Sequence, residues 1–171
     1  LGYPDALFNR AVCLMLGHGT TKDSIEAFRQ FRTAANMGNK QALHNLAGCY
    51  MHGVGTHKND SLAIACYTLS ASNGYAPSQT ILADCYLRGT GVEKDSTTAY
   101  HWFGKAAEQN EPIALFTLAE KHAKQDSIAA LSKRKLRKSP AIDYMRKAAR
   151  YGSKEAQRFI VKCFAEGKYL K

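Results

Sequence analysis

Residues 78–110 read SQTILADCYLRGTGVEKDSTTAYHWFGKAAEQN, and the rest of the chain repeats this pattern. Small or apolar residues at spacings of three and four share one face of a helix, and here they are Ser78, Leu82, Cys85 and Tyr86. Gly89 and Gly91 permit the positive φ angles of a tight turn, and Asp95 can cap a second helix. The stretch therefore predicts two helices joined by a glycine turn.

The same unit recurs at a spacing of 36 residues. The matching positions are Ala11, Ala47, Ala83 and Ala119; Leu46, Leu82 and Leu118; the turns at Gly17 and Gly19, Gly53 and Gly55, and Gly89 and Gly91; and the caps Asp23, Asn59 and Asp95. The expected helix ends are Gly2, Gly38, Gly74, Asn110 and, after 42 residues, Gly152. An internal repeat of this length predicts a solenoid.

Residues 42–74 and 78–110 closely resemble the Sel1-like repeat, a relative of the tetratricopeptide repeat. Residues 6–38 match its pattern less closely, and residues 114–152 keep Leu118 and Lys147 but lose the glycine turn. The resemblance implies an all-α, right-handed α/α superhelical solenoid of about four helix hairpins plus a terminal helix. We expect one domain over residues 1–171, with repeats at about 5–38, 41–74, 77–110 and 113–152, and a partial repeat at 155–171.

Leu1 and Gly2 look like the tail of an earlier helix, so we expect the chain to be a fragment of a longer array. No stretch of the sequence approaches the apolar run of about 18 residues that a membrane span needs.

Cys13, Cys49 and Cys85 recur at the 36-residue spacing, and Cys163 holds the same position in the fifth repeat. A position repeated once per hairpin on the core stripe predicts small buried hydrophobes rather than disulfides or metal ligands. The resemblance adds that the cysteines of the disulfide-rich branch of the family are absent, because alanine stands at Ala42, Ala71, Ala107 and Ala149. Unpaired thiols favour a reducing compartment, such as the cytoplasm or, for a bacterial effector, the host cytosol.

No sequence pattern of an enzyme, a metal site or a nucleotide site is found. The chain has no Gly-x-Ser-x-Gly, His-Glu-x-x-His or Walker sequence. His44 and His52 lie eight residues apart, which is not the spacing of a zinc-binding helix. We therefore expect no catalytic residues, no metal and no cofactor, and we interpret Trp102 as a packing residue.

The fourth repeat carries six additional residues and most of the positive charge. Residues 1–119 hold nine basic and nine acidic residues, whereas residues 120–171 hold fifteen and five. A basic run replaces the glycine turn: Lys133, Arg134, Lys135, Arg137 and Lys138. Ser139 and Pro140 then predict the start of a helix. The charge fits either a solvated terminal helix or a surface that binds nucleic acid or an anionic membrane.

The resemblance implies that the first helices of successive repeats line a concave groove. Side chains alternating with the core stripe should face it: Asn9, Val12, His44, Asn45, Met51, His52, Thr80, Asp84, Leu87, Arg88, Phe116 and Glu120. Such a mixture of amides, single charges and apolar groups suits an extended or helical peptide, with Met51 or Phe116 as an anchor. Our first hypothesis is a non-enzymatic scaffold for a protein partner. The alternative is the anion-binding module on the basic run and terminal helix.

Overall fold

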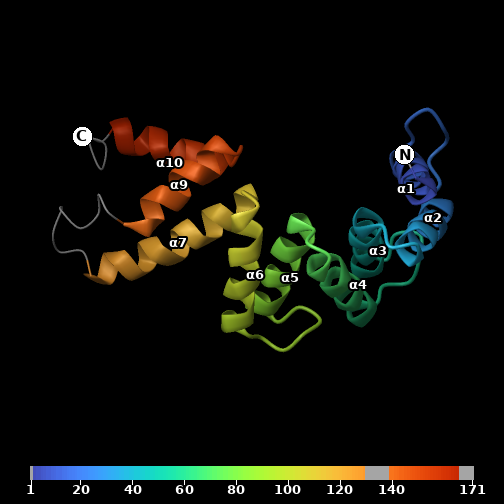
Figure 1. Ribbon diagram of the computed structural model, residues 1–171, viewed down its shortest axis with the longest axis horizontal. Coiled ribbons are helices and arrows are strands. Elements are labelled where there is room, and N and C mark those ends of the chain that lie inside the picture. The colour runs from blue at the N-terminus through green and yellow to red at the C-terminus, as the bar shows by residue number, and fades with distance from the viewer. Residues whose placement is uncertain (1, 130–138, 166–171) are drawn as a thin grey trace. The chain divides into compact units, whose positions relative to one another are not determined.

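The computed structural model describes residues 2–129 and 139–165 (Figure 1). These residues form helices and no strands, which confirms the all-α prediction. The helices are α1 (Tyr3–Leu16), α2 (Ser24–Asn36), α3 (Lys40–His52), α4 (Asp60–Ser72), α5 (Ala76–Arg88), α6 (Ser96–Glu108), α7 (Pro112–Ala129), α9 (Pro140–Arg150) and α10 (Lys154–Ala165).

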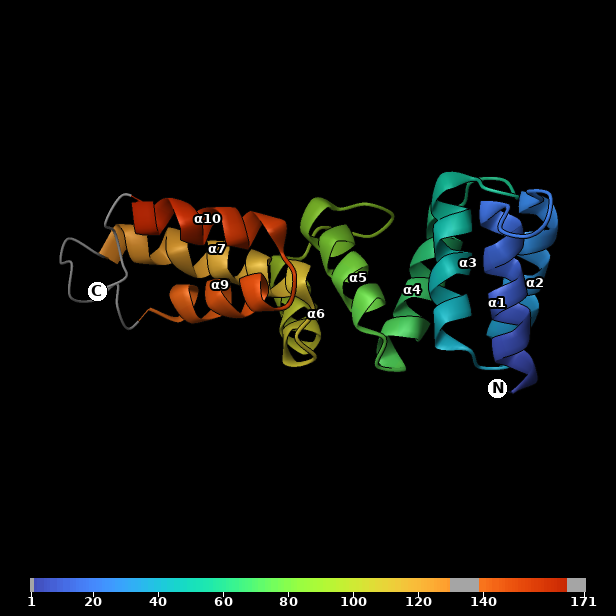
Figure 2. The ribbon, with the colours of Figure 1, turned by 90° about the horizontal axis from the view of Figure 1, so that it is seen from above.

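The chain divides into two compact units, Leu1–Ala99 and Tyr100–Lys171. In the first unit each helix packs against the next along the chain from α1 to α5. In the second unit α9 contacts both α7 and α10, and the helices run close together in Figure 2. The organisation of residues 1–171 as a single domain stays a prediction.

The caps follow the 36-residue spacing. The side chain of Asp23 accepts hydrogen bonds from the amides of Ile25 and Glu26, and Asn59 and Asp95 cap α4 and α6 in the same way. Each cap residue also donates its own amide to a carbonyl of the preceding helix, at 2.8–3.0 Å. The three predicted caps are thus confirmed, and each ties the start of a second helix to the end of the first.

The predicted glycine turns are confirmed as well. Gly17, Gly53 and Gly89 have φ angles of 77°, 68° and 77°, which only glycine adopts without strain. The second helices end at Gly38, Gly74, Asn110 and Gly152, all with positive φ, and Asn110 is the non-glycine exception within the described residues. Gly2 differs from this expectation. Its φ is −70° rather than positive, and it lies in extended backbone directly before α1.

The second glycine of a turn packs against the second helix of the preceding repeat. A Cβ at Gly55 would overlap the Ser24 carbonyl oxygen and lie 3.0 Å from the Phe28 Cβ. One repeat later, a Cβ at Gly91 would lie 3.2 Å from the Asp60 Cβ and 3.0 Å from Ile64. Both contacts fall on the first turn of the earlier helix, so the same close approach joins successive repeats.

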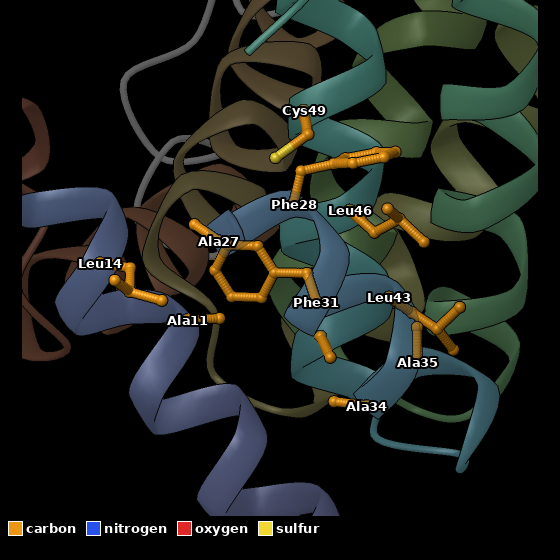
Figure 3. Close-up of a cluster of buried hydrophobic side chains, with 11 residues drawn as sticks. Ala11, Leu14, Ala27, Phe28, Phe31, Ala34, Ala35, Leu43, Leu46 and Cys49 are labelled. Atoms are coloured by element: carbon orange, nitrogen blue, oxygen red, sulfur yellow. The ribbon is translucent and has the colours of Figure 1, made fainter. Parts of the chain in front are cut away.

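The core between these helices combines alanines with aromatic rings (Figure 3). Ala11, Ala27 and Ala34 are fully buried, and Phe31 is 2% exposed. The ring of Phe31 lies 6.0 Å from that of Phe8, which joins α1 to α2. Small residues let the helices approach one another, and the phenylalanines fill the remaining space.

The cysteine prediction is confirmed for Cys49 and Cys85, which are 3% and 5% exposed. Burial raises the pKa of each thiol to about 11, so both remain protonated at neutral pH. Cys13 and Cys66 are half-buried, and all four of these cysteines are free. The side chain of Cys163 lies outside the described residues.

In the second unit, Ser139 accepts a hydrogen bond from the amide of Ala141, and Pro140 is the first residue of α9, as predicted. The ammonium group of Lys121 on α7 lies 3.6 Å from the ring centre of Tyr100 on α6. Trp102 is half-buried, with the Lys105 ammonium group 4.7 Å from its ring centre. The basic run at residues 133–138 lies outside the described residues.

The close approach of Gly55 predicts unequal effects of two matched substitutions. Gly19 has a φ of 69°, as Gly55 does, but a Cβ at Gly19 would meet nothing within 4 Å. Gly19→Ala should lower the free energy of unfolding by about 1–2 kcal/mol, the cost of the left-handed conformation. Gly55→Ala adds the clash with Ser24 and should lower it by about 3 kcal/mol or more. Urea unfolding measures both, and equal losses would contradict the packing described for Gly55.

Candidate interaction surface on the first helices

Ten of the twelve predicted groove residues lie in the first unit, on α1, α3 and α5. These are Asn9 and Val12 on α1; His44, Asn45, Met51 and His52 on α3; and Thr80, Asp84, Leu87 and Arg88 on α5. Phe116 and Glu120 lie on α7 in the second unit, where Phe116 is half-buried and Glu120 exposed. The first unit therefore carries most of the candidate residues, distributed over its three first helices.

The exposure of these side chains separates surface positions from packed ones. Asn9, His52 and Arg88 are exposed. Six more are half-buried: Val12, His44, Asn45, Met51, Asp84 and Leu87. Thr80 is 4% exposed and donates its hydroxyl to the Ala76 carbonyl, so its side chain is packed into the protein.

Asp84 and Arg88 form an ion pair within α5. The Arg88 Nε lies 2.8 Å from the Asp84 Oδ1, four residues earlier on the same helix. Their side chains remain 72% and 42% exposed, respectively, and such an exposed pair contributes about 0.3–0.5 kcal/mol to stability. Both groups therefore remain available to a partner at little cost.

His44 takes part in a hydrogen-bonded chain that crosses from the second repeat to the third. Its Nδ1 lies 2.8 Å from the Ser78 Oγ, which donates to the Ser70 Oγ at 2.7 Å. Ser70 in turn donates to the Lys40 carbonyl at 2.8 Å. Because each serine proton is already donated onward, Ser78 accepts from His44, and the histidine proton is on Nδ1.

The ring of His44 is also packed between two tyrosines. Its centre lies 5.4 Å from that of Tyr67 and 5.3 Å from that of Tyr75, both edge to face. Burial lowers the pKa of His44 below its ordinary value, so the imidazole is neutral at physiological pH. His44 thus joins α3, α4 and α5, a structural role in addition to the predicted groove position.

Sequence reasoning did not find the two serines as partners of His44. A signal was present, because Ser78 stands where the neighbouring repeats have Ala42 and Ala114. A serine at a buried alanine position needs a hydrogen-bond partner nearby, and a histidine one repeat earlier is such a partner.

Comparison with known families identifies these hairpins. The profile of the Sel1 repeat matches residues 4–39, 40–75, 76–111 and 133–153. The chain belongs to the Sel1 repeat family. Sel1 repeat proteins generally act as scaffolds for protein–protein interactions and are a non-enzymatic family.

Solved Sel1 structures have the same fold. A Sel1 repeat protein from Oxalobacter formigenes is 26% identical, with a TM-score of 0.84 over 98% of this chain and 66% of its own. A protective antigen of uropathogenic Escherichia coli, which displays the Sel1-like repeat fold, is 29% identical. Its TM-score is 0.76 over 97% of this chain and 34% of its own, so the present chain spans only part of each relative. No curated protein matches the sequence.

Within residues 2–125 and 139–162, no group of three or more His, Cys, Asp or Glu side chains could hold a metal ion. None of the described helices is both long and apolar enough to cross a membrane. The reducing compartment expected from the cysteines stays a prediction.

The buried position of His44 predicts a pH dependence of folding. Since its pKa in the native state lies below the ordinary 6.5, the unfolded chain binds more protons near pH 6 than the native protein does. The contribution of His44 should be fully present above pH 6.5 and decline as the pH falls through its native pKa.

Urea unfolding of the wild type and His44→Asn between pH 7.5 and 5 tests this. Asparagine retains an N–H group near the position of Nδ1 but does not titrate. The variant should therefore lose less stability on acidification than the wild type. Parallel losses in the two proteins would show that His44 does not cause the pH dependence.

Proposed function

We propose that this protein is a non-enzymatic interaction module whose α1, α3 and α5 bind an extended or helical peptide segment of a protein partner. The observation that carries the proposal is the set of exposed side chains that these helices present in one unit, with Asn9, His52 and Arg88 at the surface. The membership of a scaffold family supports the same class of function.

The chemistry of this surface is suited to a peptide. Asn9 and Asn45 hold the same position in successive repeats, and their amides can both donate to and accept from a peptide backbone. Met51 and Leu87 also share one position, and they are half-buried apolar side chains that can anchor a partner residue. The Asp84 carboxylate can accept hydrogen bonds from a basic group of a partner, and the Arg88 guanidinium can donate them to an acidic group.

The second candidate is binding of nucleic acid or an anionic membrane by the basic last third of the chain. Exposed basic side chains on α9 and α10 favour it: Arg146, Lys147, Arg150, Lys154, Arg158 and Lys162. Only Asp143 and Glu155 are exposed acids on the same helices. The basic run at 133–138, which lies outside the described residues, adds further positive charge to the same third of the sequence.

Affinity capture from lysate, with and without nuclease treatment and at salt concentrations from roughly 50 to 200 mM, tests the proposal. The first variant replaces Asn9, His52 and Arg88 with alanine, because these side chains are exposed and carry no part of the His44 chain. The matched control replaces Asn36, Ser72 and Lys94, which are exposed outside α1, α3 and α5. A third variant replaces Lys133, Arg134, Lys135, Arg137 and Lys138 with serine.

We expect a discrete protein that the wild type, the control and the basic-run variant capture equally. Its affinity should fall about tenfold or more in the groove variant, the effect of losing one or two interface contacts. Capture that depends on the basic run, or is lost on nuclease treatment and falls steeply between roughly 50 and 200 mM salt, would instead support anion binding.

A further inference from the structure

Gly48 lies inside α3, at the position that Val12 and Asp84 occupy in the neighbouring repeats. Glycine destabilises a helix interior relative to alanine, and Gly48 does not have the positive φ that would require it. The nearest atom to a Cβ at Gly48 would be the Tyr67 hydroxyl oxygen, 3.7 Å away, which is an ordinary van der Waals contact. Alanine would therefore fit, and packing within the protein does not explain the glycine.

Tyr67 is the second unusual residue of the same repeat. The equivalent positions hold Phe31 and Phe103, and all three rings are buried, with 5% of Tyr67 exposed. A phenyl ring thus satisfies the packing at this position, and only Tyr67 adds a hydroxyl group. Burial raises its pKa to about 12, so the hydroxyl remains a hydrogen-bond donor at neutral pH.

Within the part of the chain that the structure describes, the Tyr67 hydroxyl has no hydrogen-bond partner. Its oxygen is not one of the enclosed side-chain atoms that lack a partner, so the hydroxyl reaches the surface, where a bound acceptor can replace solvent. The Tyr67 hydroxyl oxygen lies 3.7 Å from the point that a Cβ of residue 48 would occupy. Gly48 is itself half-buried, so the gap is open to the surface of α3.

We propose that Gly48 and Tyr67 form a notch that receives the main chain of a bound peptide, whose carbonyl oxygen accepts a hydrogen bond from the Tyr67 hydroxyl. The inference rests on the proposed peptide-binding function and specifies one contact within it. A missing side chain allows a second backbone to approach a helix closely, which is a recognised use of glycine.

The surroundings of the notch define the peptide further. Asn45 and His52 lie three residues before and four residues after Gly48, which places them on the same face of α3. The Asn45 amide can bond a second main-chain group of the peptide. We expect glycine or alanine where the peptide crosses Gly48, because a backbone that approaches a helix closely leaves little space for a side chain between the two.

The test selects peptides from a phage-displayed library of random linear sequences on the whole chain. Their affinities are then measured by calorimetry for the wild type, Gly48→Ala and Tyr67→Phe. Gly104→Ala is the matched control, because Gly104 lies inside α6 and a Cβ there would meet nothing within 4 Å. His52→Ala and Arg88→Ala test the rest of the surface.

We expect the selected peptides to share a small residue and to bind Gly48→Ala and Tyr67→Phe about tenfold more weakly, as expected for one lost hydrogen bond or a steric block. Gly104→Ala should bind as the wild type does. Both glycine variants should unfold about 1–3 °C higher, since alanine favours a helix. Tyr67→Phe should unfold at the wild-type temperature, because its hydroxyl makes no bond to lose.

Two outcomes would overturn the inference in distinguishable ways. If the peptides bind Gly48→Ala and Tyr67→Phe normally but depend on His52 or Arg88, the groove binds peptides and the notch does not receive them. If no peptide is enriched, or if none of the substitutions at Gly48, Tyr67, His52 and Arg88 changes the affinity, the proposed function and the notch fail together.

Discussion

The close contact between a turn glycine and the preceding second helix is the constraint on which the arrangement of the first unit depends. At Gly55 and Gly91 the turn backbone lies against the beginnings of α2 and α4, respectively, with no room for a Cβ at Gly55 and only tight contacts for one at Gly91. The contact recurs after 36 residues because both partners recur. It fixes where each repeat meets the one before it, and the caps and left-handed glycines then determine how the chain enters the next helix.

In the first unit the close contacts between repeats and the proposed binding surface lie on different elements. The second helices and turns carry the close contacts, whereas α1, α3 and α5 retain exposed side chains such as Asn9 and Arg88. The exposed side chains on these helices can therefore vary without disturbing the turns. His44 is an exception, because its bond to Ser78 joins two repeats from within the same face. A change at this position would alter the packing between repeats together with any binding surface.

Much of the fold was predictable because its determinants are local. Asp23 caps the residues that follow it directly, and Gly89 ends the helix in which it lies, so spacing alone identifies both. Membership of the Sel1 family was predictable for the same reason. The packed positions of His44 and Thr80 were not predictable, because a helical period shows which face of a helix a side chain lies on but not how deeply that side chain is buried. Nor did periodicity show that residue 55 must lack a side chain as well as adopt a positive φ, because the atoms that exclude a side chain there belong to another repeat.

The central functional claim is that α1, α3 and α5 form the binding surface. Hydrogen–deuterium exchange of the whole chain, with and without a saturating peptide obtained by selection, tests it most directly. The account predicts added protection in α1, α3 and α5, largest around Gly48, with little change in α2 and α4. Protection confined to residues 130–165, with α3 unchanged, would contradict it and assign recognition to the basic last third of the chain.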